Sequence, residues 1–281
     1  MSSDLTPPSG SAAPAAGPAA SPKSTSGRRA HIVAVTSGKG GVGKTFLSAN
    51  LAAALARLGQ RVLVLDADLG LANLDVVLNL HPKITLHDVF TGKVDLEDAI
   101  LPAPGGFSVL LAGSGLVEYS RLTPEVREQL QRIIDTLAPR YDHILVDTGA
   151  GISDVVLYAV SLADDVLVLA TPEPTSMTDA YATIKVLATQ QERRKILLVV
   201  NQVGRSGEGR AIRGQLQLVV DRFVAPLLPP GSRAPVLELL GEVPLDSAVR
   251  ESVQKRRLLL ELLPGSSAAK AVEAIAVKLA P

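Results

Sequence analysis

The chain has 281 residues, 47% of them hydrophobic, and its Lys and Arg residues balance its Asp and Glu residues at 28 each. This is enough for one α/β domain with a buried core, and the zero net charge excludes a global positive field for nucleic acid or anionic lipid. The absence of cysteine excludes disulfides, thiolate metal sites and Cys-ligated iron–sulfur clusters, and an aromatic content of 3% excludes the stacking platforms of a single-strand nucleic-acid binder.

The N-terminal segment differs in composition from the rest of the chain. Residues 1–29 consist mostly of Pro, Gly, Ser and Ala and contain no apolar run. Such a segment cannot bury enough apolar surface to fold, and its prolines prevent the amphipathic helix of an organelle transit sequence. We therefore predict a disordered tail over residues 1–29 and a single folded domain over residues 30–281.

From His31 onward, apolar runs of strand length alternate with segments of helical periodicity. We predict strands at residues 31–36, 61–66, 107–111, 143–147, 165–170, 195–200 and 236–241, and helices at residues 45–58, 123–137, 153–162, 176–190, 211–224, 246–256 and 267–279. This alternation predicts an α/β fold, a mostly parallel, twisted β-sheet of seven or eight strands with helices on both faces. Residues 202–210 are rich in glycine, and we predict that they form a mobile loop.

A glycine-rich loop connects the first predicted strand to the first predicted helix. It matches the pattern G-x-x-x-x-G-K-[S/T] of a phosphate-binding P-loop. Glycine lets backbone N–H groups approach phosphate oxygens, and the helix N-terminus adds partial positive charge. We expect Lys44 to contact the β- and γ-phosphates and the hydroxyl of Thr45 to bind Mg²⁺. The predicted ATP-binding segment consists of Gly38, Lys39, Gly40, Gly41, Val42, Gly43, Lys44, Thr45 and Phe46.

Carboxylates follow two other predicted strands, and the ligands of such sheets bind beyond the carboxyl ends of the strands. Asp66 ends the second predicted strand and Asp68 follows it, and Asp147 follows the apolar run at residues 144–146. We expect Asp66 near the Mg²⁺ shell of Thr45, and Asp147 to act on Mg²⁺ through a water molecule. Asp68 is expected to orient or deprotonate the attacking water.

Two further positions at strand ends are candidates for nucleotide contacts. Gly149 and Gly151 flank Ala150, and they permit a backbone N–H to turn toward a γ-phosphate and to distinguish ATP from ADP. Asn201 ends another apolar run, and its amide can both donate to and accept from adenine.

The P-loop carries a second lysine, Lys39, directly after its first glycine. With this lysine it resembles the deviant Walker A motif, K-G-G-x-G-K-[S/T], of the MinD/ParA family of P-loop ATPases. The segments D-A-D-L-G-L-A-N-L-D at 66–75, D-T-G-A-G-I-S-D at 147–154 and E-P-T-S-M-T-D-A-Y at 173–181 resemble the MinD branch, and within it the FlhG (FleN or YlxH) subgroup. The resemblance covers roughly residues 31–280.

The resemblance implies roles for individual residues. Lys39 is expected to reach, in trans, the ATP of a second subunit, and Lys39, Lys44 and Asp68 are the expected catalytic residues. Asp147 is expected to belong to the second switch segment together with Gly151. Asp179 matches a position tied to partner coupling and to the second lysine. Asn201, Pro244 and Asp246 match positions of the adenine pocket.

The resemblance also implies an activity and partners. An ATPase of this kind uses ATP and Mg²⁺, forms an ATP-dependent homodimer in the cytoplasm or at the inner face of the membrane, and hydrolyses ATP slowly until a partner stimulates it. The FlhG subgroup controls the number and placement of flagella, and its expected partners are an FlhF-like GTPase, flagellar regulators or switch proteins. The open alternatives are a MinD-type division-site regulator, a ParA-type DNA-partitioning ATPase and a metabolic ATP-dependent ligase.

The chain departs from this subgroup at both ends. The tail lacks the short GTPase-stimulating motif with which FlhG proteins often begin. The last predicted helix, at 267–279, has an Ala/Val/Ile stripe with few charges, whereas a membrane-surface helix carries bulky apolar residues opposite several cations. We therefore predict that this helix packs into the core, which argues against direct membrane binding. The dispersed arginines and lysines between 205 and 257 are expected to form a solvated face and not a DNA-binding surface.

Overall fold

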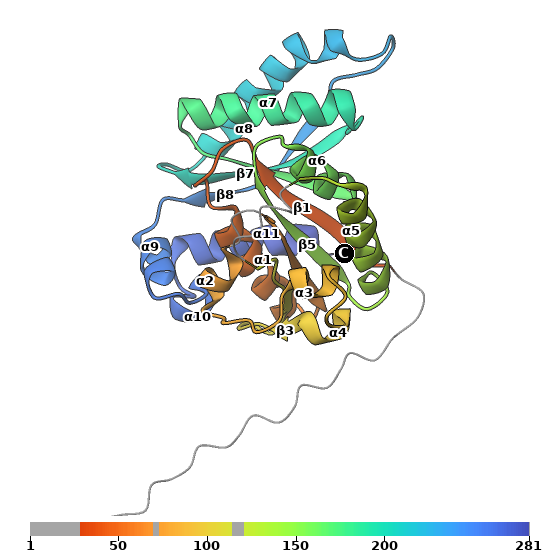
Figure 1. Cartoon of the computed structure of the whole chain (residues 1–281). Helices are drawn as coiled ribbons and strands as arrows, with labels where there is room; N and C mark the ends of the chain where they lie inside the picture. The colour runs from red at the N-terminus through yellow and green to blue at the C-terminus, as the bar shows by residue number, and fades with distance from the viewer. Residues whose placement is uncertain (1–28, 70–72, 114–120, 281) are drawn as a thin grey trace, which may run out of the picture.

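The computed structural model describes residues 29–69, 73–113 and 121–280. The predicted tail lies outside these residues except for Arg29. Figure 1 shows one central sheet with helices packed on both of its faces. This arrangement is the predicted α/β class.

The sheet has eight strands in the order β3-β4-β2-β5-β1-β6-β7-β8. The strands are β1 (His31–Ser37), β2 (Val62–Ala67), β3 (Ile100–Pro102), β4 (Ser108–Leu110), β5 (His143–Ala150), β6 (Asp165–Ala170), β7 (Lys195–Val203) and β8 (Val236–Pro244). All neighbours are parallel except β3 and β4. The seven predicted strands are therefore confirmed, and the short antiparallel edge strand β3 is the one that the sequence pattern missed.

Helices cover the two faces of the sheet in two groups. The described helices are α1 (Lys44–Arg57), α2 (Leu74–Leu78), α3 (Leu86–Phe90), α4 (Leu96–Ala99), α5 (Pro124–Leu137), α6 (Asp154–Ser161), α7 (Pro174–Gln190), α8 (Glu208–Phe223), the 3₁₀ turn η2 (Ala225–Leu227), α9 (Ser247–Gln254), α10 (Leu259–Leu262) and α11 (Ser267–Leu279). Buried residues of α5, α6, α7 and α8 form the apolar core on one face. Those of α1, α2, α10 and α11 form the core on the other.

Local signals explain where the longer helices begin and end. Thr123 caps α5 by accepting a hydrogen bond from the backbone N–H of Val126, and Pro124 takes the first helical position, where its missing N–H costs nothing. Gly59 follows α1 with φ +82°, a left-handed conformation that glycine adopts without strain. Both boundaries lie where the sequence predicts them.

The predicted mobile loop at 202–210 is wrong at both ends. Strand β7 continues through Val203 because it still pairs with β8 there, opposite Pro244. Helix α8 begins at Glu208, whose carboxylate accepts a hydrogen bond from the N–H of Gly204. Only four residues therefore connect the two elements, and the glycine content reflects a tight turn and not a long loop.

Helix α11 packs into the core as predicted. The positions that it buries against α1 and β8 are Ala268, Ala269, Val272, Ile275, Ala276 and Leu279. Its small apolar side chains allow close packing on the sheet. In the part of the chain that the structure describes, no helix combines the length and the hydrophobicity that crossing a membrane requires.

Candidate functional site

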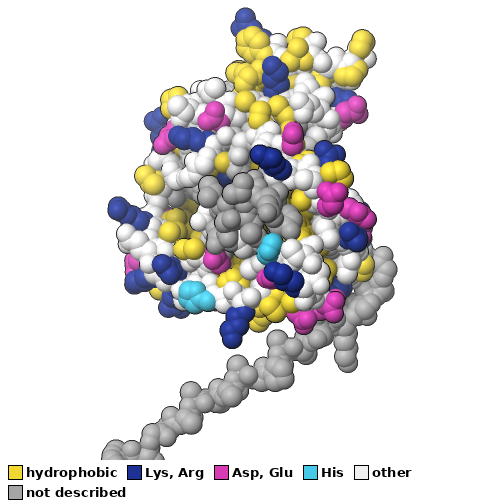
Figure 2. Space-filling model, viewed as in Figure 1, with side chains coloured by type: hydrophobic (Ala, Val, Ile, Leu, Met, Phe, Trp, Pro, Cys, Tyr) yellow, Lys and Arg dark blue, Asp and Glu magenta, His cyan; other side chains and the backbone are white. Residues whose placement is uncertain are grey.

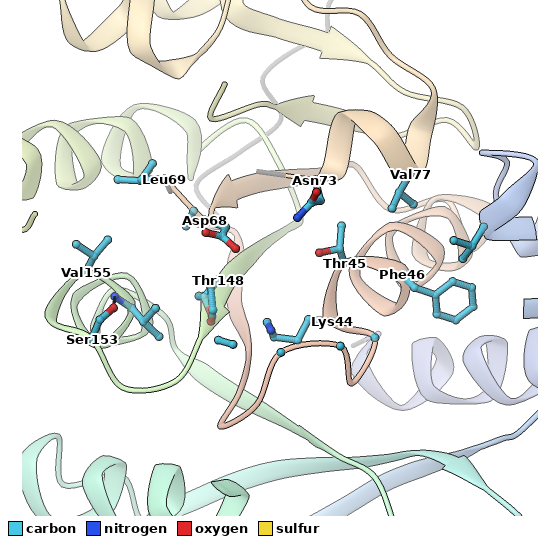
Figure 3. Close-up of a pocket in the computed structure, with 18 residues that line it drawn as sticks. Lys44, Thr45, Phe46, Asp68, Leu69, Asn73, Val77, Thr148, Ser153 and Val155 are labelled. Atoms are coloured by element: carbon cyan, nitrogen blue, oxygen red, sulfur yellow. Dashed lines mark hydrogen bonds between the residues drawn. The ribbon is translucent and has the colours of Figure 1, made fainter. Parts of the chain in front are cut away.

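A cavity of about 620 Å³ opens at the carboxyl ends of the central strands. Its lining comes from the P-loop, from the exits of β2 and β5, and from α2, α6 and α9: Gly40, Gly41, Gly43, Lys44, Thr45, Phe46, Ala67, Asp68, Leu69, Asn73, Val77, Thr148, Gly149, Ala150, Ser153, Val155, Val156 and Val253. In Figure 3 the side chains of Lys44, Thr45 and Asp68 border the same open space. The strand exits therefore meet where the parallel topology predicts a ligand.

Close backbone approaches explain two glycines of the P-loop. Gly43 precedes α1 with φ +99°, and a Cβ added there would lie 2.6 Å from the Nδ2 atom of Asn201. A Cβ added at Gly38 would lie 2.2 Å from the carbonyl oxygen of Asp179. Any side chain at these positions would displace backbone or a buried amide, so the loop conformation requires glycine at both.

Lys44 lies on the inner side of the loop. Its Nζ donates a hydrogen bond to the Ser37 hydroxyl at 3.1 Å, and its side chain lines the cavity. Burial lowers the pKa of Lys44, while the charges of Asp147 and Asp68 oppose this shift. The ammonium group thus lies near two carboxylates and borders the cavity.

Lys39 lies on the outer side of the same loop. Its Nζ donates to Glu173 Oε2 at 2.8 Å and to Thr175 Oγ1 at 3.1 Å, both at the start of α7. The Lys39 side chain is 39% exposed and does not line the cavity. The two lysines of this loop therefore point to different places: Lys44 to the cavity and Lys39 to the start of α7.

Asp66 and Asp147 lie directly opposite each other on the neighbouring parallel strands β2 and β5. Both are buried, and the Asp147 Oδ1 atom accepts a hydrogen bond of 2.9 Å from Ser48. Burial raises the pKa of Asp147 to about 6, although hydrogen bonds from the Thr45 and Ser48 hydroxyls and the charge of Lys44 lower it. Burial and the charge of Asp147 raise the pKa of Asp66 well above its usual value.

Asp68 follows the end of β2 and lines the cavity. Its backbone N–H donates to Asp66 Oδ1 at 3.1 Å, which fixes the turn between the two carboxylates. A Cβ added at Gly149 would contact the Asp68 carboxylate at 3.4 Å, so the exit of β5 closes directly on this side chain. The predicted separation of roles fits this geometry, since Asp66 is buried beneath the cavity and Asp68 faces it.

The residues at the base of the cavity fit a magnesium ion. The Asp66 Oδ2 atom is buried and has no hydrogen-bond partner among the described residues. Within those same residues, no group of three or more His, Cys, Asp or Glu side chains could hold a metal by itself. Mg²⁺ at a nucleotide site uses one or two carboxylates together with phosphate oxygens and water, so Thr45, Asp66 and Asp147 suffice as the protein's share.

Gly151 and Asp179 lie beside the cavity without lining it. The N–H of Gly151 donates to the Ser37 carbonyl at 2.8 Å, so the backbone that faces the cavity belongs to Gly149 and Ala150. Asp179 contacts the P-loop through its backbone, against Gly38. The hydrogen-bond partners of Lys39 are Glu173 and Thr175, whereas the sequence pointed to Asp179. The switch role of Gly151 and the coupling role of Asp179 remain predictions.

The three predicted adenine contacts lie at the exits of β7 and β8, and none of them lines the cavity. Asn201 is buried, and its Nδ2 donates to the Val42 carbonyl at 2.8 Å. Asp246 accepts from the N–H groups of Ala248 and Ala268, which joins α9 to α11. Pro244 is the last residue of β8. The adenine role of these residues stays a prediction, since structural bonds engage both polar side chains.

Sequence reasoning missed four side chains that shape the site. Ser37 and Ser48 bond to Lys44 and Asp147, and Glu173 and Thr175 bond to Lys39. Two of them could have been predicted from their positions in the sequence. Ser37 directly precedes the P-loop, and Ser48 lies one helical turn after Lys44. Glu173 and Thr175 are separated from Lys39 by more than 130 residues, so no local pattern could join them.

Comparisons with known proteins agree with this geometry. A family model described as an AAA domain matches residues 30–199. The antiactivator FleN of Pseudomonas aeruginosa is 43% identical over 247 residues, which cover 88% of this chain and 85% of FleN. The flagellum site-determining protein YlxH of Helicobacter pylori is 32% identical over 249 residues, which cover 87% of this chain and 80% of YlxH.

A solved structure shares the fold. The septum site-determining protein MinD from Pyrococcus horikoshii, in complex with Mg-ADP, matches with a TM-score of 0.70 at 27% identity and covers 89% of this chain and 96% of its own.

Proposed function

Because this chain belongs to the MinD/ParA family of P-loop ATPases, we propose that it is an ATP-dependent dimerising switch that controls the number or placement of flagella. In this cycle ATP binding joins two copies face to face, hydrolysis to ADP and phosphate separates them, and partner proteins set the rate. The family supports ATP as the nucleotide, and the dimer and its cellular role are the proposal.

The observation that carries this proposal is the divergence of the two P-loop lysines. Lys44 lines the cavity and bonds to Ser37, whereas Lys39 lies at the surface on Glu173 and Thr175. A lysine that an ordinary P-loop does not need, placed on the outer rim of a phosphate site, is available to a phosphate presented by a second copy. Lys44 then binds the subunit's own nucleotide, and Lys39 binds the nucleotide of its mate.

The carboxylates divide the chemistry of hydrolysis. Asp68 faces the cavity and would orient the attacking water or accept its proton. Thr45, Asp66 and Asp147 would hold Mg²⁺ with the phosphates, and the ion would neutralise charge that develops on the phosphoryl group. Lys44 adds a fixed positive charge on the same side. Asp147 lies on β5, so its segment can transmit the state of the nucleotide to α6.

The relatives support a flagellar setting for the switch. One is named an antiactivator and another a flagellum site-determining protein, and each aligns with more than four fifths of this chain. We propose by analogy that the partners are a flagellar GTPase of the FlhF kind, flagellar regulators or switch proteins.

The DNA-partitioning alternative needs a broad basic surface. On the face shown in Figure 2, Lys and Arg side chains are mixed with Asp and Glu side chains. This interspersed pattern favours a switch that acts on protein partners.

Substitution of Asp68 tests the proposed turnover. In Asp68→Ala the water loses its orienting carboxylate, so we expect kcat for ATP hydrolysis to fall at least 100-fold while ATP binding persists and the dimer accumulates. Phosphate release measures the turnover, and light scattering measures the dimer.

Asp135→Ala is the matched control, because Asp135 is an exposed carboxylate on α5 far from the strand exits. It should hydrolyse ATP at the unsubstituted rate. Normal turnover by Asp68→Ala would remove Asp68 from the mechanism, and a monomer that turns over ATP without dimerising would refute the switch.

A further inference from the structure

A second and larger cavity, of about 870 Å³, lies along the free edge of the sheet. Strand β8 forms its floor, and among the described strands β8 pairs with β7 alone. Helix α8 packs on one face of β8 and α11 on the other. Residues of both helices line the cavity, which we call the groove. No residue of the P-loop lines this groove, and neither do Asp66, Asp68 and Asp147, so it is separate from the nucleotide site.

Positive charge predominates in the groove. Its five cations are Arg194, Lys195, Arg210, Arg213 and Lys278, and its two acids are Glu238 and Glu242. The structure already uses both acids, because the Glu242 carboxylate accepts from the N–H groups of Gly207 and Gly209 at the start of α8, and Glu238 Oε2 lies 4.0 Å from Lys195 Nζ. Lys195 likewise pairs with Asp165 at 3.2 Å, and Lys278 donates to the Leu240 carbonyl.

Arg210 and Arg213 differ from these engaged groups. They lie one turn apart on the wall of the groove that α8 forms, and neither makes a hydrogen bond or an ion pair within the described parts of the chain. Arg213 is half-buried, which strengthens its attraction for a carboxylate. Two neighbouring guanidinium groups present paired donors that match carboxylates well.

The floor of the groove combines apolar residues with Glu238 and Glu242, and its backbone is partly covered. Val236 is 61% exposed and Leu239 is half-buried, and both line the groove. The Gln217 amide bonds to the N–H of Leu237 and the carbonyl of Pro235, and so blocks one end of the edge against pairing with another strand. A ligand here is therefore recognised by side chains, over a strand that spans about 20 Å from Val236 to Glu242.

We propose that this groove binds an extended acidic segment of a partner protein. Apolar side chains of the segment would cover Val236 and Leu239, and its carboxylates would bind Arg210 and Arg213. Nucleic acid fits less well, because the exposed Val236 offers the ligand an apolar contact that a phosphate backbone does not use. The inference does not depend on the flagellar role, since it rests on the groove alone.

Selection from a displayed library of random heptapeptides tests the proposal. The unsubstituted full-length protein is the bait, and the double variant Arg210→Glu/Arg213→Glu serves for counter-selection. We expect the retained peptides to combine at least two acidic residues with apolar ones. A synthetic, fluorescein-labelled copy should bind at least tenfold more weakly to the double variant, and Arg210→Lys/Arg213→Lys should fall between the two because it keeps the charge and loses the paired donors.

A charge-matched control is Lys83→Glu/Arg121→Glu, which reverses two exposed cations that do not line the groove. It should bind the peptide like the unsubstituted protein, and all variants should bind ATP equally, which shows that they are folded. Retained peptides without an excess of Asp and Glu, or equal peptide binding by the Arg210→Glu/Arg213→Glu variant, would overturn the proposal. A 20-base-pair DNA duplex that binds this groove more tightly than the selected peptide would also overturn it.

Discussion

The two halves of the nucleotide end of the sheet use their polar side chains in opposite ways. At the exits of β1, β2 and β5, Asp66 has a buried oxygen with no hydrogen-bond partner among the described residues, and Asp147 has a raised pKa. At the exits of β7 and β8, Asn201 and Asp246 are fully engaged in hydrogen bonds that support the P-loop and join α9 to α11. The first half, which we call the charged half, therefore gathers acidic groups that a bound ligand would contact. The second, the bracing half, uses its polar side chains in hydrogen bonds that stabilise the structure.

The largest expected effect is on the charged half. Lys44→Ala removes the ammonium group at the base of the cavity, and we expect ATP affinity to fall at least 100-fold, since a hydrogen bond between charged groups contributes roughly 1.5–3 kcal/mol and Lys44 serves more than one phosphate. Titration calorimetry measures the ATP affinity. Lys39→Ala is the control within the same loop and should keep ATP affinity within threefold. An affinity for Lys44→Ala within fivefold of the original would contradict this assignment.

The charged half should also destabilise the nucleotide-free protein. Because the folded-state pKa of Asp147 is above its unfolded value, the folded state holds the proton more tightly, and the free energy of unfolding falls as pH rises from about 4 to about 6. Asp147→Asn keeps an acceptor for Ser48 and removes the charge. It should raise the free energy of unfolding at pH 7.5 by up to about 3 kcal/mol and weaken the pH dependence, as measured by urea denaturation. Loss of stability would contradict the comparison.

The bracing half should respond with the opposite sign. Asp246→Ala removes the cap of α9 and the bond to the N–H of Ala268, so we expect the free energy of unfolding to fall by about 1–2 kcal/mol. The same urea experiment measures it, and Asp246→Asn should retain most of the stability because its amide oxygen still accepts. If Asp246→Ala unfolded at the original urea concentration, Asp246 would have no bracing role.

The sequence predicted the charged half better than the bracing half for a physical reason. Lys44, Thr45 and the aspartates follow apolar strands within continuous motifs, and parallel topology brings strand exits together. The bracing contacts and the bond from Lys39 to Glu173 join residues distant in sequence, which only the folded chain brings together. Strand β3 and the helices α2, α3, α4 and α10 are too short for their periodicity to be read.

The smallest expected effect concerns the ion pair between Lys39 and Glu173. Glu173→Gln weakens the ion pair that holds Lys39 in the single chain, and since both partners are substantially exposed, the pair contributes at most about 1 kcal/mol. The ATP-dependent dimer should therefore become tighter by roughly two- to fivefold, measured by the concentration dependence of light scattering. A weaker dimer would show that Glu173 supports the dimer instead of competing with it.

The most direct test of the account is the mass of the particle formed by Lys39→Ala with a non-hydrolysable ATP analogue, measured by light scattering during gel filtration. The unsubstituted protein should double in mass with the analogue. Lys39→Ala should bind the analogue equally well and keep the mass of one chain. Dimers of Lys39→Ala as abundant as those of the unsubstituted protein would contradict the claim that Lys39 binds the nucleotide of a second copy.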